Sequence, residues 1–143
     1  MIIDIIIQIA MSFVGTIGFS ILFNVPKKEL VFCGIGGSIG WMLHYFMMDT
    51  SPILGTFAGT AAVAAIARHL AYRRKMPVTI YMIPGIIPLV PGAGIYFTMF
   101  YIVMGEYNDA MLRGVATLAA AGVIALGLLA VLSLPRRLFG YKM

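Results

Sequence analysis

Long apolar runs separated by short polar breaks dominate this chain. A helix rises about 1.5 Å per residue, so about 20 residues cross the hydrocarbon core of a bilayer. A transmembrane β-barrel would need segments of about 10 residues with alternating polarity, and none is visible. The pattern therefore predicts an all-α integral membrane protein, a single transmembrane domain over residues 1–143, with about five spans at residues 2–23, 30–48, 53–72, 76–105 and 110–134.

The fourth run, residues 76–105, is interrupted at its centre. Proline lacks an N–H, and its ring clashes with the carbonyl four residues earlier. Irregular backbone near mid-membrane is tolerated only against protein or a water-filled cavity, and transporters use such breaks to bind substrates. We therefore expect the substrate site here, with a kink that serves packing alone as the alternative. The residues concerned are three prolines and three glycines: Pro84, Gly85, Pro88, Pro91, Gly92 and Gly94.

Few polar side chains inside the runs suit a role in binding. Arg113 lies near the start of the fifth run, and its guanidinium is suited to a substrate carboxylate. The alternative is an ion pair with Asp109, four residues earlier on the same helix. His44 is a candidate proton relay or simply an interfacial histidine. We expect Arg68 to extend toward the nearer membrane surface and Cys33 to be a buried thiol.

Composition and charge support a membrane location. The chain is 62% hydrophobic and 10% charged, with mean hydropathy +1.01, whereas soluble domains carry about 25% charged residues. Acidic residues lie in the turns after the second and fourth runs, and basic residues follow the first, third and fifth. The positive-inside rule then predicts an external N-terminus and a cytoplasmic C-terminus. Hence the net charge of +5 indicates a lipid bilayer as partner and not nucleic acid; the basic residues are Lys27, Lys28, Arg73, Arg74, Lys75, Arg136, Arg137 and Lys142.

The chain offers little for catalysis. It has one cysteine and two distant histidines, and it lacks paired carboxylates, a nucleophile–base set and a nucleotide-binding loop. We therefore expect no enzyme activity, no metal and no cofactor, and an ion gradient as the energy source for transport. Glycines four apart, at Gly36 and Gly40 and at Gly55 and Gly59, predict close helix packing.

Several segments resemble the C-terminal half of the threonine/serine exporter family. The proline–glycine motif is the most specific of them, and the likeness extends over nearly the whole chain. The segments are Phe23–Pro26, Gly37–Trp41, Ile83–Gly92 and Gly122–Gly127.

The resemblance implies a bacterial inner-membrane exporter of small polar solutes. In split members of that family two proteins supply the two halves, and this chain is similar to the short one, which implies a larger partner subunit. Threonine/serine-type amino acids and C4-dicarboxylates such as succinate are the implied substrates. An odd number of spans suggests that the partner half is inverted relative to this one. A non-transporting membrane scaffold is the main alternative, while a membrane-embedded enzyme or a self-sufficient channel has less support.

Overall fold

The computed structural model describes residues 2–135, and over this part the chain is helical without strands. Four helices are long and apolar enough to cross a membrane, and the bent pair formed by residues 78–89 and 92–104 makes a fifth candidate span. The predicted all-helical membrane fold is confirmed. The elements are α1 (Ile2–Leu22), α2 (Leu30–Met48), α3 (Pro52–Arg74), α4 (Val78–Ile86), the 3-10 turn η1 (Ile87–Leu89), α5 (Gly92–Met104) and α6 (Tyr107–Leu132).

Local sequence signals determine where several helices begin and end. Ser51 precedes α3, and its hydroxyl accepts a hydrogen bond from the Leu54 N–H at 3.5 Å, while Pro52 occupies the first turn. These are the residue types preferred at a helix N-terminus. At the end of α5, Gly105 adopts a φ of 78°, a left-handed conformation that glycine takes without steric cost.

Helices α1 to α4 form a packed bundle in which α2 lies between α1 and α3, and α4 packs against α2 and α3. The glycines allow this close approach. A Cβ added to Gly59 would lie 2.5 Å from the carbonyl oxygen of Gly40, and one added to Gly55 would lie 2.9 Å from that of His44. The predicted close packing is confirmed at these three glycines, whereas Gly36 has room for a Cβ at 3.5 Å from Ile66.

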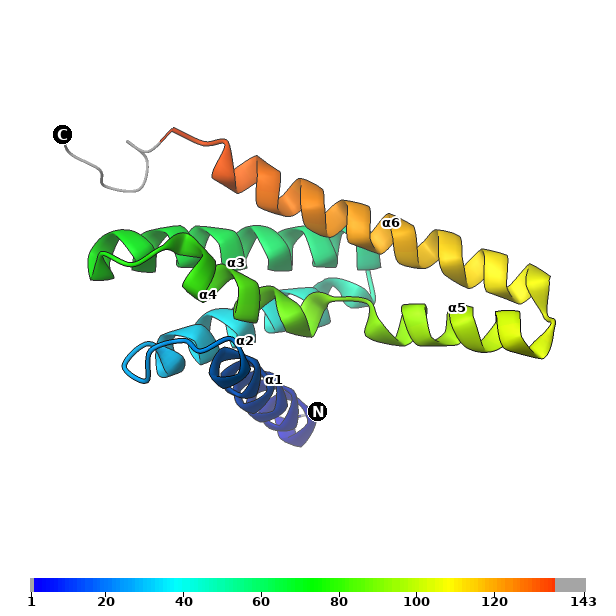
Figure 1. Cartoon of the computed structure of the whole chain (residues 1–143), viewed down its shortest axis with the longest axis horizontal. Coiled ribbons are helices and arrows are strands. Elements are labelled where there is room, and N and C mark those ends of the chain that lie inside the picture. Colours follow the sequence, from blue (N-terminus) through cyan, green and yellow to red (C-terminus); the bar gives the residue numbers. More distant parts are fainter. Residues whose placement is uncertain (1, 136–143) are drawn as a thin grey trace.

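One end of the molecule, which we call the anchored end, comprises turns 23–29 and 75–77 and the last turn of α6 (left in Figure 1). Glu29 is buried there, and its carboxylate accepts hydrogen bonds from the Arg74 guanidinium and, at 2.7 Å, from the Tyr81 hydroxyl. Arg74 also lies over the Phe32 ring, 4.3 Å from its centroid. The Arg74 guanidinium lowers the pKa of Glu29 below its ordinary value, despite the opposing effect of burial. This network ties together three helices.

Arg68 belongs to the same end, and the expectation for it was wrong. It does not extend to a membrane surface: the residue is 6% exposed, and its guanidinium donates hydrogen bonds to the carbonyls of Val131 and, at 3.0 Å, of Leu134. The last carbonyls of a helix have no partner within it and carry the negative end of the helix dipole. Arg68 therefore caps α6 and attaches it to α3. Arg136, Arg137 and Lys142, also predicted for this side, lie outside the described residues.

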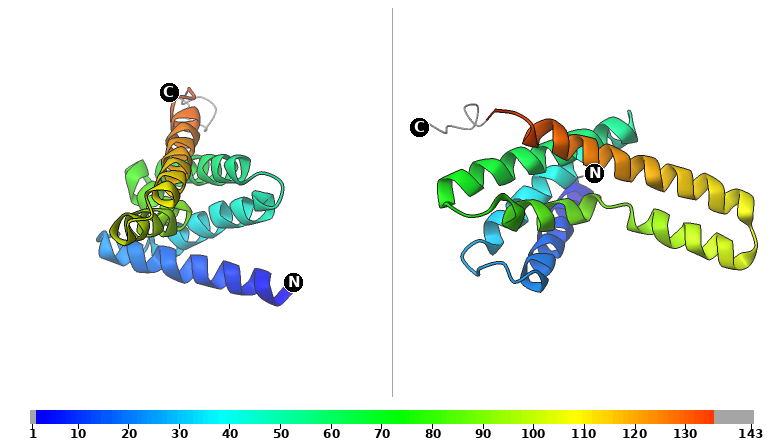
Figure 2. Two further views of the ribbon diagram at one scale, coloured as in Figure 1. Left: turned by 90° about the vertical axis from the view of Figure 1, so that its right-hand side faces the viewer. Right: turned by 45° about the horizontal axis from the view of Figure 1, so that its top comes forward.

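The other end, which we call the open end, comprises the turn 49–51, α5 and the first half of α6. Here α5 and α6 extend together as a hairpin away from the bundle (right in Figure 1), and α5 buries none of its residues. Figure 2 shows α1 lying crosswise to α6, on the far side of the bundle from it. The helices of the described chain therefore expose much apolar surface, as expected for elements that face lipid or another protein.

Candidate functional site: the cavity at the helix break

The helix break is narrower than the sequence predicts. Helix α4 continues through Pro84 to Ile86, η1 follows, and the chain leaves helical geometry at Val90 and Pro91 before α5 begins at Gly92. The two segments meet at a bend of 52°. Pro91 cannot donate a hydrogen bond to the Ile87 carbonyl, which accepts one from the Val90 N–H instead, at 3.1 Å. The last proline of the motif thus defines the bend.

Pro84 is accommodated inside α4 because another residue replaces its missing donor. A proline at this position leaves the Ile80 carbonyl without its helical partner. The thiol of Cys33, from α2, donates to that carbonyl at 3.4 Å. Cys33 is 1% exposed, so its predicted burial is confirmed. The thiol serves a second purpose that composition alone did not indicate, since it satisfies a buried backbone group at membrane depth.

A cavity of about 540 Å³ lies where α2, α3 and α6 meet the break. Five of the seven predicted site residues line it: Pro88, Pro91, Gly92, Gly94 and Arg113. Proximity of the break to Arg113, which is distant in sequence, follows from the packing of α5 against α6. A Cβ on Gly94 would lie 2.4 Å from the Thr117 hydroxyl oxygen, so the two helices approach closely beside the cavity.

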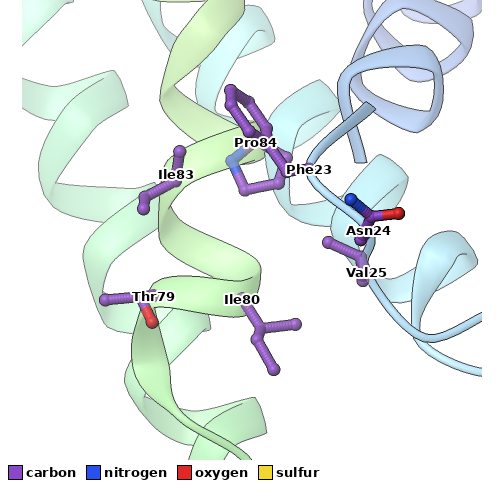
Figure 3. A pocket seen from close by; sticks show the side chains of 7 residues that line it. All are labelled: Phe23, Asn24, Val25, Thr79, Ile80, Ile83 and Pro84. Atoms are coloured by element: carbon purple, nitrogen blue, oxygen red, sulfur yellow. The ribbon is translucent and has the colours of Figure 1, made fainter. Parts of the chain in front are cut away.

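The other two predicted site residues, Pro84 and Gly85, are buried and lie outside this cavity. A Cβ on Gly85 would lie 2.8 Å from Cγ1 of Val63, so this glycine serves the packing of α4 against α3. Pro84 lines a smaller pocket of about 240 Å³ between α4 and the turn after α1. Figure 3 shows its ring beside Phe23, with Ile80 of α4 on the side of the turn that holds Asn24. The first part of the motif is therefore a packing surface.

Arg113 is the charged side chain among the residues that line the larger cavity. The alternative considered for it, an ion pair with Asp109, is not formed: within residues 2–135 the ion pair described joins Arg74 to Glu29. Arg113 is exposed, and no carboxylate of the described residues pairs with its guanidinium. A guanidinium without a carboxylate partner can bind an anionic solute with two parallel hydrogen bonds.

Sequence reasoning did not place Trp41 and Thr56 at the site, and it left His44 undecided. All three line the cavity. The Thr56 hydroxyl and His44 Nδ1 are 3.3 Å apart, the rings of Trp41 and His44 are 5.5 Å apart, and Trp41 Nε1 donates to the Gln8 side chain at 2.8 Å. Residues three apart share a face of a helix, so the spacing of Trp41 and His44 was the available signal. Only the tertiary structure brings that face to the break.

The polar residues that do not line the cavity mostly bond to their own helix backbone. The hydroxyls of Ser12, Thr16 and Ser20 each donate to a carbonyl three or four residues earlier, and they form a buried stripe on α1. Thr60 does the same on α3. These side chains are satisfied locally, so they are poor candidates for a substrate site.

The fold and the cavity define a class: a multi-pass helical membrane protein in which a broken span opens on a pocket, the arrangement used by transporters. The family follows from sequence comparison. The profile of the family described as "Threonine/Serine exporter, ThrE" matches residues 8–134, so the chain belongs to the threonine/serine exporter family.

One relative illustrates how much of a longer protein this chain corresponds to. A Haemophilus influenzae protein, named "Uncharacterized protein", is 29% identical over 92 residues, which is 63% of this chain and 31% of the relative. The chain therefore matches about a third of that relative's length. No solved structure matches the chain.

Proposed function

We propose that this chain is the short membrane subunit of a secondary exporter, coupled to an ion gradient, that moves small polar solutes together with a larger partner subunit of the same family. The observation that carries the proposal is the cavity at the break. It joins irregular backbone, an unpaired guanidinium and hydrogen-bonding side chains from α2 and α3 in one place. Membership of an exporter family supports a transport role.

The cavity suits the carboxylate that amino acids and C4-dicarboxylates share. Helix α5 is 13 residues long and begins at the break. At its start the Gly92 N–H donates to the Val90 carbonyl at 2.8 Å and the Ile95 N–H to the Pro91 carbonyl at 3.1 Å. The N–H groups of Ala93 and Gly94 remain for a ligand, at the positive end of the helix dipole. Arg113, on α6, adds a full positive charge to the lining of the same cavity. Threonine, serine and succinate are therefore the candidate solutes, with one carboxylate held between Arg113 and the start of α5.

The test is efflux from bacterial cells loaded with labelled threonine, serine or succinate. The wild-type chain is expressed alone and together with the larger family protein. The Gly92→Leu variant of the chain is expressed together with the same larger protein. A Cβ on Gly92 meets nothing within 4 Å, so the variant is expected to fold while its side chain occupies the cavity. Gly122→Leu is the matched control, because Gly122 has equal space but does not line the cavity. We expect efflux with the partner, lost in Gly92→Leu and retained in Gly122→Leu.

Co-purification of both proteins accompanies each measurement and separates transport from assembly. A stable wild-type complex with no efflux of the three solutes would refute the proposal and favour a membrane scaffold. Equal loss of efflux in both variants would argue against the cavity as the transport path.

We also propose that the protein lies in the bacterial inner membrane with its anchored end in the cytoplasm. Support comes from Lys27, Lys28 and the basic cluster after α3, which gather at that end (Figure 1). The buried Cys33 allows a direct test with single added cysteines. A membrane-impermeant maleimide applied to whole cells should label Asp49→Cys and spare Lys27→Cys. The reverse labelling pattern would mean the opposite orientation.

A further inference from the structure

The hydrogen bonds around Thr56 favour one tautomer of His44. A hydroxyl has one proton to donate. Thr56 donates its proton to the Pro52 carbonyl at 2.9 Å. With that proton directed to Pro52, the Thr56 oxygen, 3.3 Å from His44 Nδ1, acts as the acceptor, and this assignment places the hydrogen on Nδ1. In the neutral imidazole this leaves the Nε2 lone pair as the site that accepts a second proton.

The charges around His44 make its protonation sensitive to a bound anion. Arg113 of α6 lines the cavity, together with the uncharged Pro52 and Thr56 of α3. The break contributes no titratable side chain to the lining. On α2 itself the neighbours are Trp41, Met48 and, beyond the cavity, the uncharged Gln8 of α1 that binds Trp41. No carboxylate is among the lining residues; Asp49, at the end of α2, and Asp4, on α1, lie outside the lining. A second positive charge on His44 would thus be opposed by Arg113 until an anion enters.

We propose that His44 is the residue that couples proton uptake to the binding of a dicarboxylate in this cavity. This inference deepens the proposed function and names the substrate class for the same site. With the dianion bound, Arg113 holds one carboxylate and protonated His44 faces the other. The proton comes from water in the cavity, adds to the Nε2 lone pair, and returns to water on the far side when the solute leaves. Proton and dicarboxylate therefore cross in the same direction, and the outward gradient of the solute supplies the energy for export by this route. Protonation of His44 strengthens the binding of a zwitterionic amino acid less, because the two positive charges repel its ammonium group.

Trp41 gives a readout that does not depend on transport. It is the single tryptophan of the chain, and its ring lies 5.5 Å from that of His44. A protonated imidazole quenches indole fluorescence at such a distance, whereas a neutral one quenches it much less. The full chain in lipid nanodiscs is titrated between about pH 5 and 8, the range in which histidine changes charge, with no solute, with succinate or with threonine.

We expect the fluorescence midpoint to move to higher pH by about one unit with saturating succinate, which corresponds to about tenfold tighter succinate binding to the protonated form. Threonine should move it by much less. His44→Gln should abolish the titration. His69→Gln is the matched control: it removes the other histidine, which is exposed on α3 outside the cavity, and should leave the titration unchanged. Arg113→Gln should keep the titration and lose most of the succinate shift.

Two results would overturn the inference. One is a titration that persists in His44→Gln, and the other is a wild-type midpoint that succinate does not move. Its failure is distinct from that of the proposed function. Efflux without a succinate-dependent shift of the midpoint would support the exporter proposal and show that His44 does not couple proton uptake to succinate binding. A succinate-dependent shift without efflux would support succinate binding at this site and argue against a transport role.

Discussion

The two halves of the broken span, α4 and α5, have similar composition and opposite environments. Helix α4 has nine residues and buries Tyr81, Pro84 and Gly85, whereas the thirteen residues of α5 include none that is buried. Packing on three sides holds α4, while α5 contacts mainly α6. The difference indicates that the motif joins a half-helix packed within the bundle to one that leaves the bundle at the 52° bend.

The largest expected contrast compares one glycine from each half. Gly85→Leu forces a side chain against Val63, and overpacking of this kind costs about 3 kcal/mol. Gly92→Leu enters open space and should leave stability nearly unchanged. Thermal unfolding in detergent measures the stability of both variants. Equal destabilisation by the two variants would mean that the halves are anchored alike.

Arg68 is expected to have the next largest effect. Arg68→Met leaves the last carbonyls of α6 without their buried donor, at a cost of about 2 kcal/mol. Hydrogen exchange should increase at the last turn of α6 and stay constant in α5. Arg73→Met, an exposed arginine on the same helix, is the control and should change neither quantity. If protection from hydrogen exchange falls along the whole of α6, Arg68 does not act as a local cap.

Glu29 makes the stability of the anchored end dependent on pH. Its pKa is lowered from 4.5, so the carboxylate stabilises the folded state above that value, and the contribution is lost as the pH falls through the lowered pKa. Glu29→Gln should cost about 1 kcal/mol at pH 7. The difference in melting temperature from the wild type should vanish in acid. Lys27→Gln, exposed in the same turn, should show no such dependence.

Cys33 gives the smallest expected effect. Cys33→Val removes the donor to the Ile80 carbonyl inside α4 and should cost about 1 kcal/mol. Cys33→Ser keeps a hydroxyl donor and should retain more of the stability. If valine proves as stable as serine at this position, the thiol contributes only by packing.

The sequence by itself determined the class of the protein. Runs of apolar residues long enough to span a bilayer dictate helices, because every backbone polar group in lipid must be satisfied within its own segment. Glycine spacing predicted close helix packing, and proline positions predicted a broken span. The residues that line the cavity were predicted in part, because Pro88 to Gly94 are contiguous and Arg113 carries a charge that membranes seldom tolerate without a function.

Only the tertiary structure decided which of these residues meet. The division of the motif into Pro84 and Gly85, which pack, and Pro88 to Gly94, which line the cavity, depends on Val63 and Cys33 from other helices. His44 and Thr56 join the site because Gly55 lets α3 approach the His44 backbone. Arg68 caps α6 instead of extending to the surface because the end of α6 passes beside it. These contacts join helices distant in sequence, and no periodicity within one helix can specify them.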